Sequence, residues 1–197
     1  MKRLRSHGGY SLVEVMAAMA VMSILAAFAV PMVGATTSGI KLRDQAEAVS
    51  NLVSLAKMRA TSQFKRSRVY VDLAAQTYVL QLKDADTGVW VNDDAAPVTL
   101  PFGVEFSFGK LDEPPKNAQD EIKFAAECTD DKNEPIEKTS CINFNSRGIP
   151  INADGDPVGG NAFYLTDGTG VRGITVTATP LIRNWWSSAS APGWVRQ

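Results

Sequence analysis

The chain has 197 residues, of which 45% are hydrophobic and 21% are charged, and its formal net charge at pH 7 is −1. This composition excludes a disordered chain and a chain that its net charge would draw to polyanions. The length suits one membrane segment followed by one globular domain.

An uncharged apolar run begins close to the N-terminus. No charged residue occurs from Val15 to Gly39, and three of the first five residues are basic. Since roughly 20 apolar residues cross a bilayer as a helix, residues 10–39 are predicted to form a transmembrane and assembly helix. The basic residues ahead of it predict a cytoplasmic N-terminus and an exported C-terminal part.

The segment Gly9-Tyr10-Ser11-Leu12-Val13-Glu14 resembles the processing site of type IV prepilins. A basic leader ends in glycine, the first mature residue is aromatic, and glutamate stands fifth after the cut. Pro31 falls where the same family usually carries proline. The resemblance implies that residues 1–9 are a leader, which a prepilin peptidase removes between Gly9 and Tyr10 before it methylates the new amino group of Tyr10. Tyr10 replaces the commoner phenylalanine, which is a mild departure.

The same resemblance implies that Glu14 pairs with the N-terminal ammonium of a neighbouring subunit in a filament. Such a partner would compensate a carboxylate that is costly in lipid. Glu14 could instead lie in the headgroup layer. A second alternative for the region is a cleavable secretory signal ending at Ala27-Phe28-Ala29, but Glu14 interrupts its start and apolar residues continue past the supposed cut.

Removal of the leader changes which chemistry the chain can perform. It takes away three of the 20 basic residues while all 21 acidic residues stay, so the net charge becomes −4. It also removes His7, the only histidine. The mature chain therefore lacks the imidazole that serine and cysteine hydrolases and most zinc sites use, and we predict neither enzymatic activity nor a cofactor.

Helical periodicity resumes after Gly39. One apolar stripe recurs at alternating steps of four and three, and it consists of Leu42, Ala46, Val49, Val53, Ala56 and Ala60. One helix is predicted from about Ser11 to about Phe64, weakened or interrupted over Pro31–Gly39, where proline and poor helix formers gather. Its amphipathic half, residues 40–64, is expected to bury the stripe in the domain.

Residues 65–197 change to a period of two, which predicts an antiparallel β domain. Strands are predicted at residues 69–73, 78–82, 104–108, Ile122–Ala126, Cys141–Phe144, Ala162–Thr166 and Gly173–Ala178. Lys110–Gln119 and Asp130–Thr139 are predicted to be polar surface loops. The expected fold class is therefore α+β, with a long N-terminal helix packed on antiparallel sheet, as in the pilin fold.

Two cysteines, Cys128 and Cys141, are separated by 12 residues. In an oxidising compartment such a pair predicts a disulfide that closes a surface loop. Two independent buried thiols are the alternative.

The C-terminal half resembles the GspH/FimT group of minor pilins. The resemblance rests on Phe144-Asn145-Ser146-Arg147-Gly148, Phe163-Tyr164-Leu165 and Gly173-Ile174-Thr175-Val176. It implies a long helix packed on two β-sheets. The Gly-Arg element that commonly follows the last strand in that group is replaced here by Thr179-Pro180-Leu181-Ile182-Arg183, so any function tied to that element is in doubt.

Two further groups of residues are candidate binding sites. Asn152, Asp154 and Asp156 place oxygen atoms at alternate positions, as a calcium loop does, but the glycine spacing departs from an EF-hand and a solvated turn is favoured. A basic and aromatic tail is formed by Arg172, Arg183, Trp185, Trp186, Trp194 and Arg196. Its residue types suit contacts with another protein or with DNA, and the acidic net charge favours the protein.

These features predict a structural minor pilin or pseudopilin of a type IV pilus or of a type II secretion pseudopilus. Its expected partners are other pilins or pseudopilins, prepilin peptidase, inner-membrane lipid and the inner-membrane assembly machinery. The alternative is a DNA-binding minor pilin for DNA uptake in natural transformation. The expected location is the bacterial inner membrane, with one membrane pass and a periplasmic domain, and then the filament.

Overall fold

The computed structural model describes residues 11–197, apart from the side chains of residues 28–38. Helix α1 spans Leu12–Gln63, which confirms the predicted helix to within a residue at each end. It continues through Pro31–Gly39, since one lost backbone hydrogen bond does not by itself end a helix. The residues up to Thr37 and those from Ser38 onward form two compact units, which are described separately.

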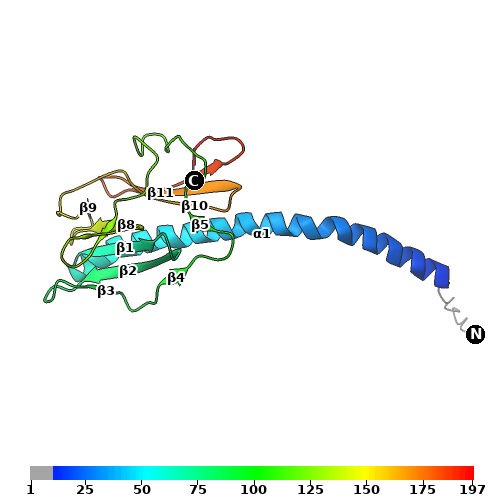
Figure 1. The fold of residues 1–197 in the computed structure, drawn as a ribbon, viewed down its shortest axis with the longest axis horizontal. Helices are drawn as coiled ribbons and strands as arrows, with labels where there is room; N and C mark the ends of the chain where they lie inside the picture. Colours follow the sequence, from blue (N-terminus) through cyan, green and yellow to red (C-terminus); the bar gives the residue numbers. More distant parts are fainter. Residues whose placement is uncertain (1–10) are drawn as a thin grey trace, which may run out of the picture. The chain divides into compact units, whose positions relative to one another are not determined.

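Two large antiparallel sheets and a small two-stranded one, β6 Cys128–Thr129 with β7 Pro135–Ile136, build the unit that begins at Ser38 (Figure 1). The first has the order β3-β2-β1-β8-β9 with β4 also paired to β2, and its strands are β1 Ser67–Asp72, β2 Thr77–Lys83, β3 Trp90–Asn92, β4 Val98–Thr99, β8 Thr139–Phe144 and β9 Pro150–Ile151. The second has the order β13-β12-β11-β10-β5, and its strands are β5 Glu105–Phe106, β10 Asn161–Thr166, β11 Gly170–Val176, β12 Ile182–Ser188 and β13 Val195–Arg196. The fold class predicted from the sequence is therefore confirmed.

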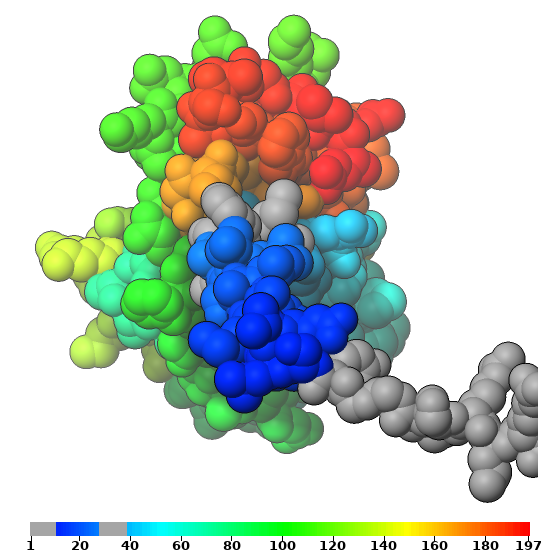
Figure 2. Space-filling model, turned by 90° about the vertical axis from the view of Figure 1, so that its right-hand side faces the viewer, coloured from blue at the N-terminus to red at the C-terminus, as the bar shows by residue number. Residues whose placement is uncertain are grey.

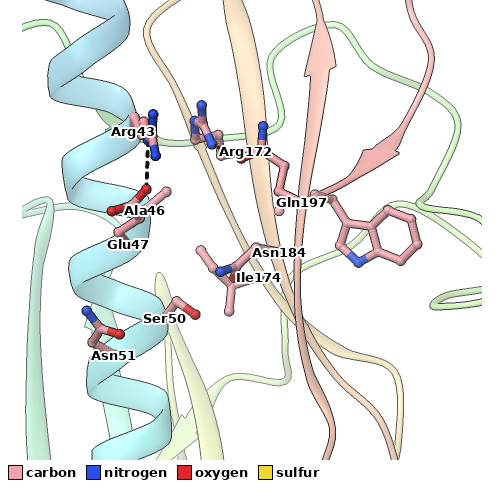
Figure 3. A pocket seen from close by; sticks show the side chains of 11 residues that line it. Arg43, Ala46, Glu47, Ser50, Asn51, Arg172, Ile174, Asn184 and Gln197 are labelled. Carbon is pink, nitrogen blue, oxygen red and sulfur yellow. Dashed lines mark hydrogen bonds and ion pairs between the residues drawn. The ribbon is translucent and has the colours of Figure 1, made fainter.

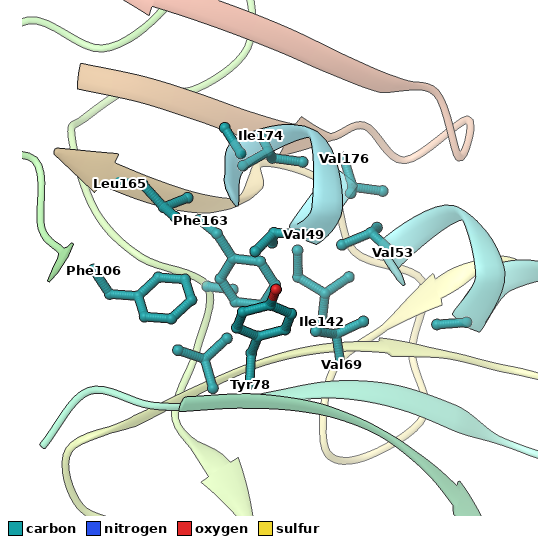
Figure 4. Packing of buried hydrophobic residues seen from close by; sticks show 14 of the residues in the cluster. Val49, Val53, Val69, Tyr78, Phe106, Ile142, Phe163, Leu165, Ile174 and Val176 are labelled. Carbon is teal, nitrogen blue, oxygen red and sulfur yellow. The ribbon is translucent and has the colours of Figure 1, made fainter. Parts of the chain in front are cut away.

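The second half of α1 lies between the two sheets and supplies their common core. All six residues of the predicted stripe are buried, and Val49, Val53, Ala56 and Ala60 are fully so. Figure 4 shows Val49 and Val53 with Ile174 of the second sheet on one side and Val69 of the first on the other. Because the stripe touches both sheets, it joins them into one hydrophobic core.

A smaller apolar cluster covers the face of the second sheet that points away from the helix. Its buried members are Leu111, Ala162, Tyr164 and Val171, and Phe108, Ile122, Phe124 and Trp194 pack against them. The rings of Phe124 and Trp194 each lie with their centroids 5.8 Å from that of Tyr164. The segment from Ile122 to Phe124 thus covers a sheet rather than forming part of one.

Two expectations about the β domain were wrong. Ile122–Ala126 forms no strand, because Ile122 and Phe124 face the Tyr164 cluster while the backbone makes no continuous ladder. The predicted loop Asp130–Thr139 contains β7, Pro135–Ile136, which pairs with β6, Cys128–Thr129. In addition, β12, which pairs with β11 over seven residues, was not predicted.

Candidate functional site

The predicted cleavage site between Gly9 and Tyr10 lies outside the described residues. The structure begins at the next position, where Ser11 caps α1. The Ser11 Oγ accepts a hydrogen bond from the Val13 backbone N–H at 3.3 Å, and Glu14 Oε2 accepts one from the Ser11 N–H at 3.4 Å. This reciprocal arrangement is a variant of the capping box in which the Ser11 Oγ accepts from the second rather than the third helical residue, and Glu14 stabilises the first turn of the helix in the isolated chain.

The apolar residues that follow Glu14 have no cover within the chain. Every described residue from Ser11 to Ala27 is exposed, and the large apolar side chains from Leu12 to Leu25 have exposed fractions between 46% and 78%. Water-soluble surfaces rarely carry so much contiguous apolar area, so lipid or another protein chain must cover this segment.

Within the part of the chain that the structure describes, no helix is both long enough and apolar enough to cross a membrane. The predicted transmembrane segment, residues 10–39, lies partly outside that part. The side chain of Pro31, predicted to act in assembly, also lies outside the described residues.

The residues of the candidate calcium loop serve the turn in which they lie. Asn152 Oδ1 accepts a hydrogen bond from the Asp156 backbone N–H at 2.8 Å, and the Asn152 carbonyl accepts one from Gly155 N–H at 3.2 Å. Asp154 is exposed. No group of three or more His, Cys, Asp or Glu side chains gathers for a metal ion among the described residues.

Two tryptophans of the basic and aromatic tail take part in the packing of the second sheet. Trp185 is buried and its indole N–H donates to Thr175 Oγ1 at 2.9 Å. Trp194 packs on Tyr164 and donates to the Glu113 carbonyl at 2.5 Å, which explains why the red C-terminal residues and the green segment lie side by side in Figure 2.

The other tail residues are more open. Arg172 of β11 is opposite Trp186 of β12 in the sheet register, and both are partly exposed. Arg183 is partly exposed and Arg196 is exposed. The six residues therefore form no single patch, and Trp185 and Trp194 are already used for packing.

A pocket of about 520 Å³ lies where α1 faces β11 and β12. Its charged residues are Arg43 and Glu47 of the helix and Arg172 of the sheet, and Figure 3 shows the two arginine side chains near one another at its upper end. Arg43 Nε donates to Glu47 Oε1 at 2.7 Å. The guanidinium of Arg172 donates through a terminal nitrogen to Gln197 Oε1.

Sequence reasoning singled out Arg172 but missed Arg43 and Glu47. They lie on the exposed side of the helical stripe, where charged residues are ordinary, and they are far from Arg172 along the chain. Only the packing of α1 against the second sheet brings these three side chains together. No pattern in the sequence signals that meeting.

Comparison with known proteins concerns the N-terminal segment first. Residues 4–30 match a family model described as a prokaryotic N-terminal methylation motif. The chain carries this motif. The resemblance of its N-terminal segment to the type IV prepilin processing site is thereby confirmed, and Ser11 and Glu14 of the capping box both belong to the methylation motif.

Comparisons over the rest of the chain are more distant. No curated protein matches. Two solved structures of the minor pseudopilin EpsH from the type II secretion system of Vibrio cholerae are similar, at 14% and 19% identity and TM-scores of 0.45 and 0.44. They cover 73% and 78% of this chain, and 95% of their own chains in each case. Similarity at this level does not indicate a function.

Proposed function

We propose that this chain is a structural minor pilin or pseudopilin subunit of a type IV pilus or a type II secretion pseudopilus. The observation that carries the proposal is the methylation motif followed directly by a helix whose apolar side chains are exposed. A helix that follows a processed amino terminus and exposes apolar side chains along its first part suits contact with lipid and assembly into a helical bundle.

In this proposal, prepilin peptidase removes residues 1–9 and methylates Tyr10. Glu14 then exchanges its capping contact with the Ser11 N–H for the N-terminal ammonium of a neighbouring subunit. The chain is anchored in the bacterial inner membrane with its domain in the periplasm, and it joins other pilins through the inner-membrane assembly machinery. The disulfide between Cys128 and Cys141 fits an oxidising compartment.

The DNA-binding alternative has no specific observation in its favour. Base stacking needs open aromatic faces, whereas Trp185 is buried and Trp194 packs on Tyr164. The net charge of the processed chain, −4, opposes long-range attraction to a polyanion.

Mass spectrometry of the chain recovered from cells that contain prepilin peptidase tests the processing step. We expect a mature chain that begins with N-methyl-tyrosine at position 10. Gly9→Leu is the matched control, because a bulky residue at the cleavage position should leave the leader attached. A chain that begins at Val30 shows signal-peptidase cleavage instead and contradicts the proposal.

Assembly is tested by separating the two roles of Glu14. Glu14→Gln keeps an oxygen that can cap Ser11 N–H but removes the charge, whereas Ser11→Ala removes the cap and keeps the charge. We expect Glu14→Gln to reduce recovery of the chain in sheared filaments about tenfold or more, and Ser11→Ala to assemble nearly as wild type. If Glu14→Gln assembles normally, Glu14 is a helix cap only and the proposed assembly contact is wrong.

A further inference from the structure

The pocket between α1 and the second sheet holds an unbalanced set of charges. Two guanidinium groups, those of Arg43 and Arg172, line it together with one carboxylate, that of Glu47. Burial lowers the pKa of Arg172, and the nearby charge of Arg43 lowers it further, while Glu47 acts in the opposite direction. Asp167 also attracts Arg172, but it does not line the pocket.

The donors of this pocket are not all used within the chain. Arg172 Nε is buried and has no hydrogen-bond partner, although the same guanidinium donates to Gln197. Glu47 accepts a hydrogen bond from the Nε of Arg43 alone, and the side chain of Arg43 is 64% exposed. Asn184 Oδ1, which also lines the pocket, is a buried acceptor without a partner, but the two guanidinium groups still offer more donors than the chain uses. A buried donor without a partner is costly, so an acceptor that enters the pocket would be stabilised there.

The carboxylate of Glu47 limits the negative charge that an acceptor in the pocket can carry. An arginine pair suits a planar carboxylate, which can accept two parallel hydrogen bonds from one guanidinium. A phosphate group carries more negative charge and would meet the carboxylate of Glu47 in the same pocket. Among the lining side chains two are cationic and one is anionic, so a single carboxylate balances the charge of the side chains.

We propose that this pocket binds the carboxylate of an aspartate or glutamate side chain presented by a partner pilin-like subunit. The identity of the partner rests on the proposed function, whereas the preference for a carboxylate rests on the pocket. In an assembled filament, such a contact would tie the acidic side chain of one subunit to both α1 and β11 of the next. It would fix the rotation of the domain relative to its neighbour, because both arginines must face the same carboxylate.

The full-length processed chain in detergent micelles, labelled with ¹⁵N-arginine, permits a direct test. The probes are acetyl-Ala-Glu-Ala-amide, the same peptide with glutamine, inorganic phosphate and a short single-stranded oligonucleotide. We expect the glutamate peptide to shift the Nε–H signals of Arg43 and Arg172 and to bind about tenfold more tightly than the glutamine peptide. Equal binding of the two peptides, or tighter binding of phosphate or the oligonucleotide, overturns the proposal.

Three variants separate the pocket from general charge effects. Arg172→Gln should weaken binding of the glutamate peptide about tenfold, and Arg147→Gln, which makes the same charge change at an exposed turn, should not. Glu47→Gln should strengthen binding several-fold, because the competing carboxylate is gone, and a misfolded protein cannot produce that gain. Weaker binding in Glu47→Gln contradicts the proposal.

A measurement in cells identifies the source of the carboxylate. Arg172→Gln should lower the recovery of co-assembled pilins while leaving N-methylation of Tyr10 unchanged. If recovery is unchanged although peptide binding is lost, the carboxylate does not come from a pilin-like subunit. A chain that is methylated but does not bind the glutamate peptide keeps the proposed function and loses this inference.

Discussion

Asp167 occupies the turn between β10 and β11 and holds it through one carboxylate oxygen. Its Oδ1 accepts hydrogen bonds from the Thr169 backbone N–H at 2.9 Å, the Thr169 hydroxyl at 2.7 Å and the Gly170 N–H at 3.1 Å. Burial raises the pKa of Asp167, but these hydrogen bonds outweigh burial and leave the pKa below its usual value of 3.8. The ionised form of Asp167 therefore stabilises the folded state.

The stability that Asp167 contributes should depend on pH in a defined direction. Because its pKa is lower in the folded chain, the contribution is fully present above about pH 4 and disappears as the pH falls through the folded pKa. We expect Asp167→Asn to reduce the fall in stability between pH 5 and about pH 2, as measured by urea unfolding at several pH values. Asp154→Asn, at an exposed turn, is the matched control, and a profile unchanged in Asp167→Asn contradicts this account.

At the scale of elements, the β6–β7 hairpin is attached to the rest of the domain by a disulfide and by hydrogen bonds. The disulfide joins Cys128 to Cys141, whose Cα atoms are 4.9 Å apart, and both side chains are buried. The buried Arg68 donates to the Thr129 carbonyl at 2.7 Å while its guanidinium lies 4.1 Å from the centroid of Trp90. Asp131 Oδ1 accepts the backbone N–H of Trp90 at 3.0 Å.

Replacing both cysteines by serine should loosen this hairpin and leave the helix in place. The loop-entropy model gives the disulfide about 3 kcal/mol, and the contacts of Arg68 and Asp131 limit the local loss of order. We expect faster hydrogen exchange in residues 129–140 and unchanged protection in the buried half of α1. Reduction of the wild-type chain should reproduce the effect, and free thiols in protein recovered from cells contradict the disulfide itself.

At the scale of the whole molecule, the second half of α1 belongs to the hydrophobic core of both large sheets. Val53 is fully buried on α1 and belongs to a cluster that includes Val69 of β1 and Val176 of β11. A helix that contacts both sheets couples their stability, because without it the apolar inner faces of both sheets would be exposed to water. The domain from Ser38 onward should therefore unfold as one cooperative unit.

Val53→Ala tests this coupling. Removing two methyl groups from a fully buried site should cost about 2 kcal/mol, counting the lost apolar burial and the cavity left behind. Hydrogen exchange should become faster in β1 and β11 by the same factor. Met58→Ala, at a site that is 59% exposed, should change stability by less than about 0.5 kcal/mol. Loss of protection in only one sheet argues against a shared core.

The sequence by itself determined where the helix lies and which of its faces is buried. The stripe from Leu42 to Ala60 repeats at the period of an α-helix, and that period depends only on local geometry. The positions of β1, β2, β8, β10 and β11 were likewise predicted from a period of two, since successive side chains of a strand point to opposite faces of a sheet. The cysteine pair also needed no tertiary information, since spacing and compartment suffice to predict it.

Tertiary structure alone decided which alternating segments become strands. Ile122 and Phe124 alternate with Lys123 as a strand would, but alternation shows only which side chains meet a core, and here the backbone crosses over a sheet without joining it. Trp185 and Trp186 stand next to each other in β12, so both faces of that strand are apolar and the period of two is lost.

Tertiary structure also decided which charges meet. Arg43 and Glu47 belong to the solvated side of α1, and Arg172 belongs to a strand far along the chain. The period of the sequence predicts which face of its own helix or strand each of these residues occupies. It does not predict which residue of another element lies beside it. Their common pocket exists because the helix stripe is buried against the second sheet, which brings the edge of that stripe up to β11.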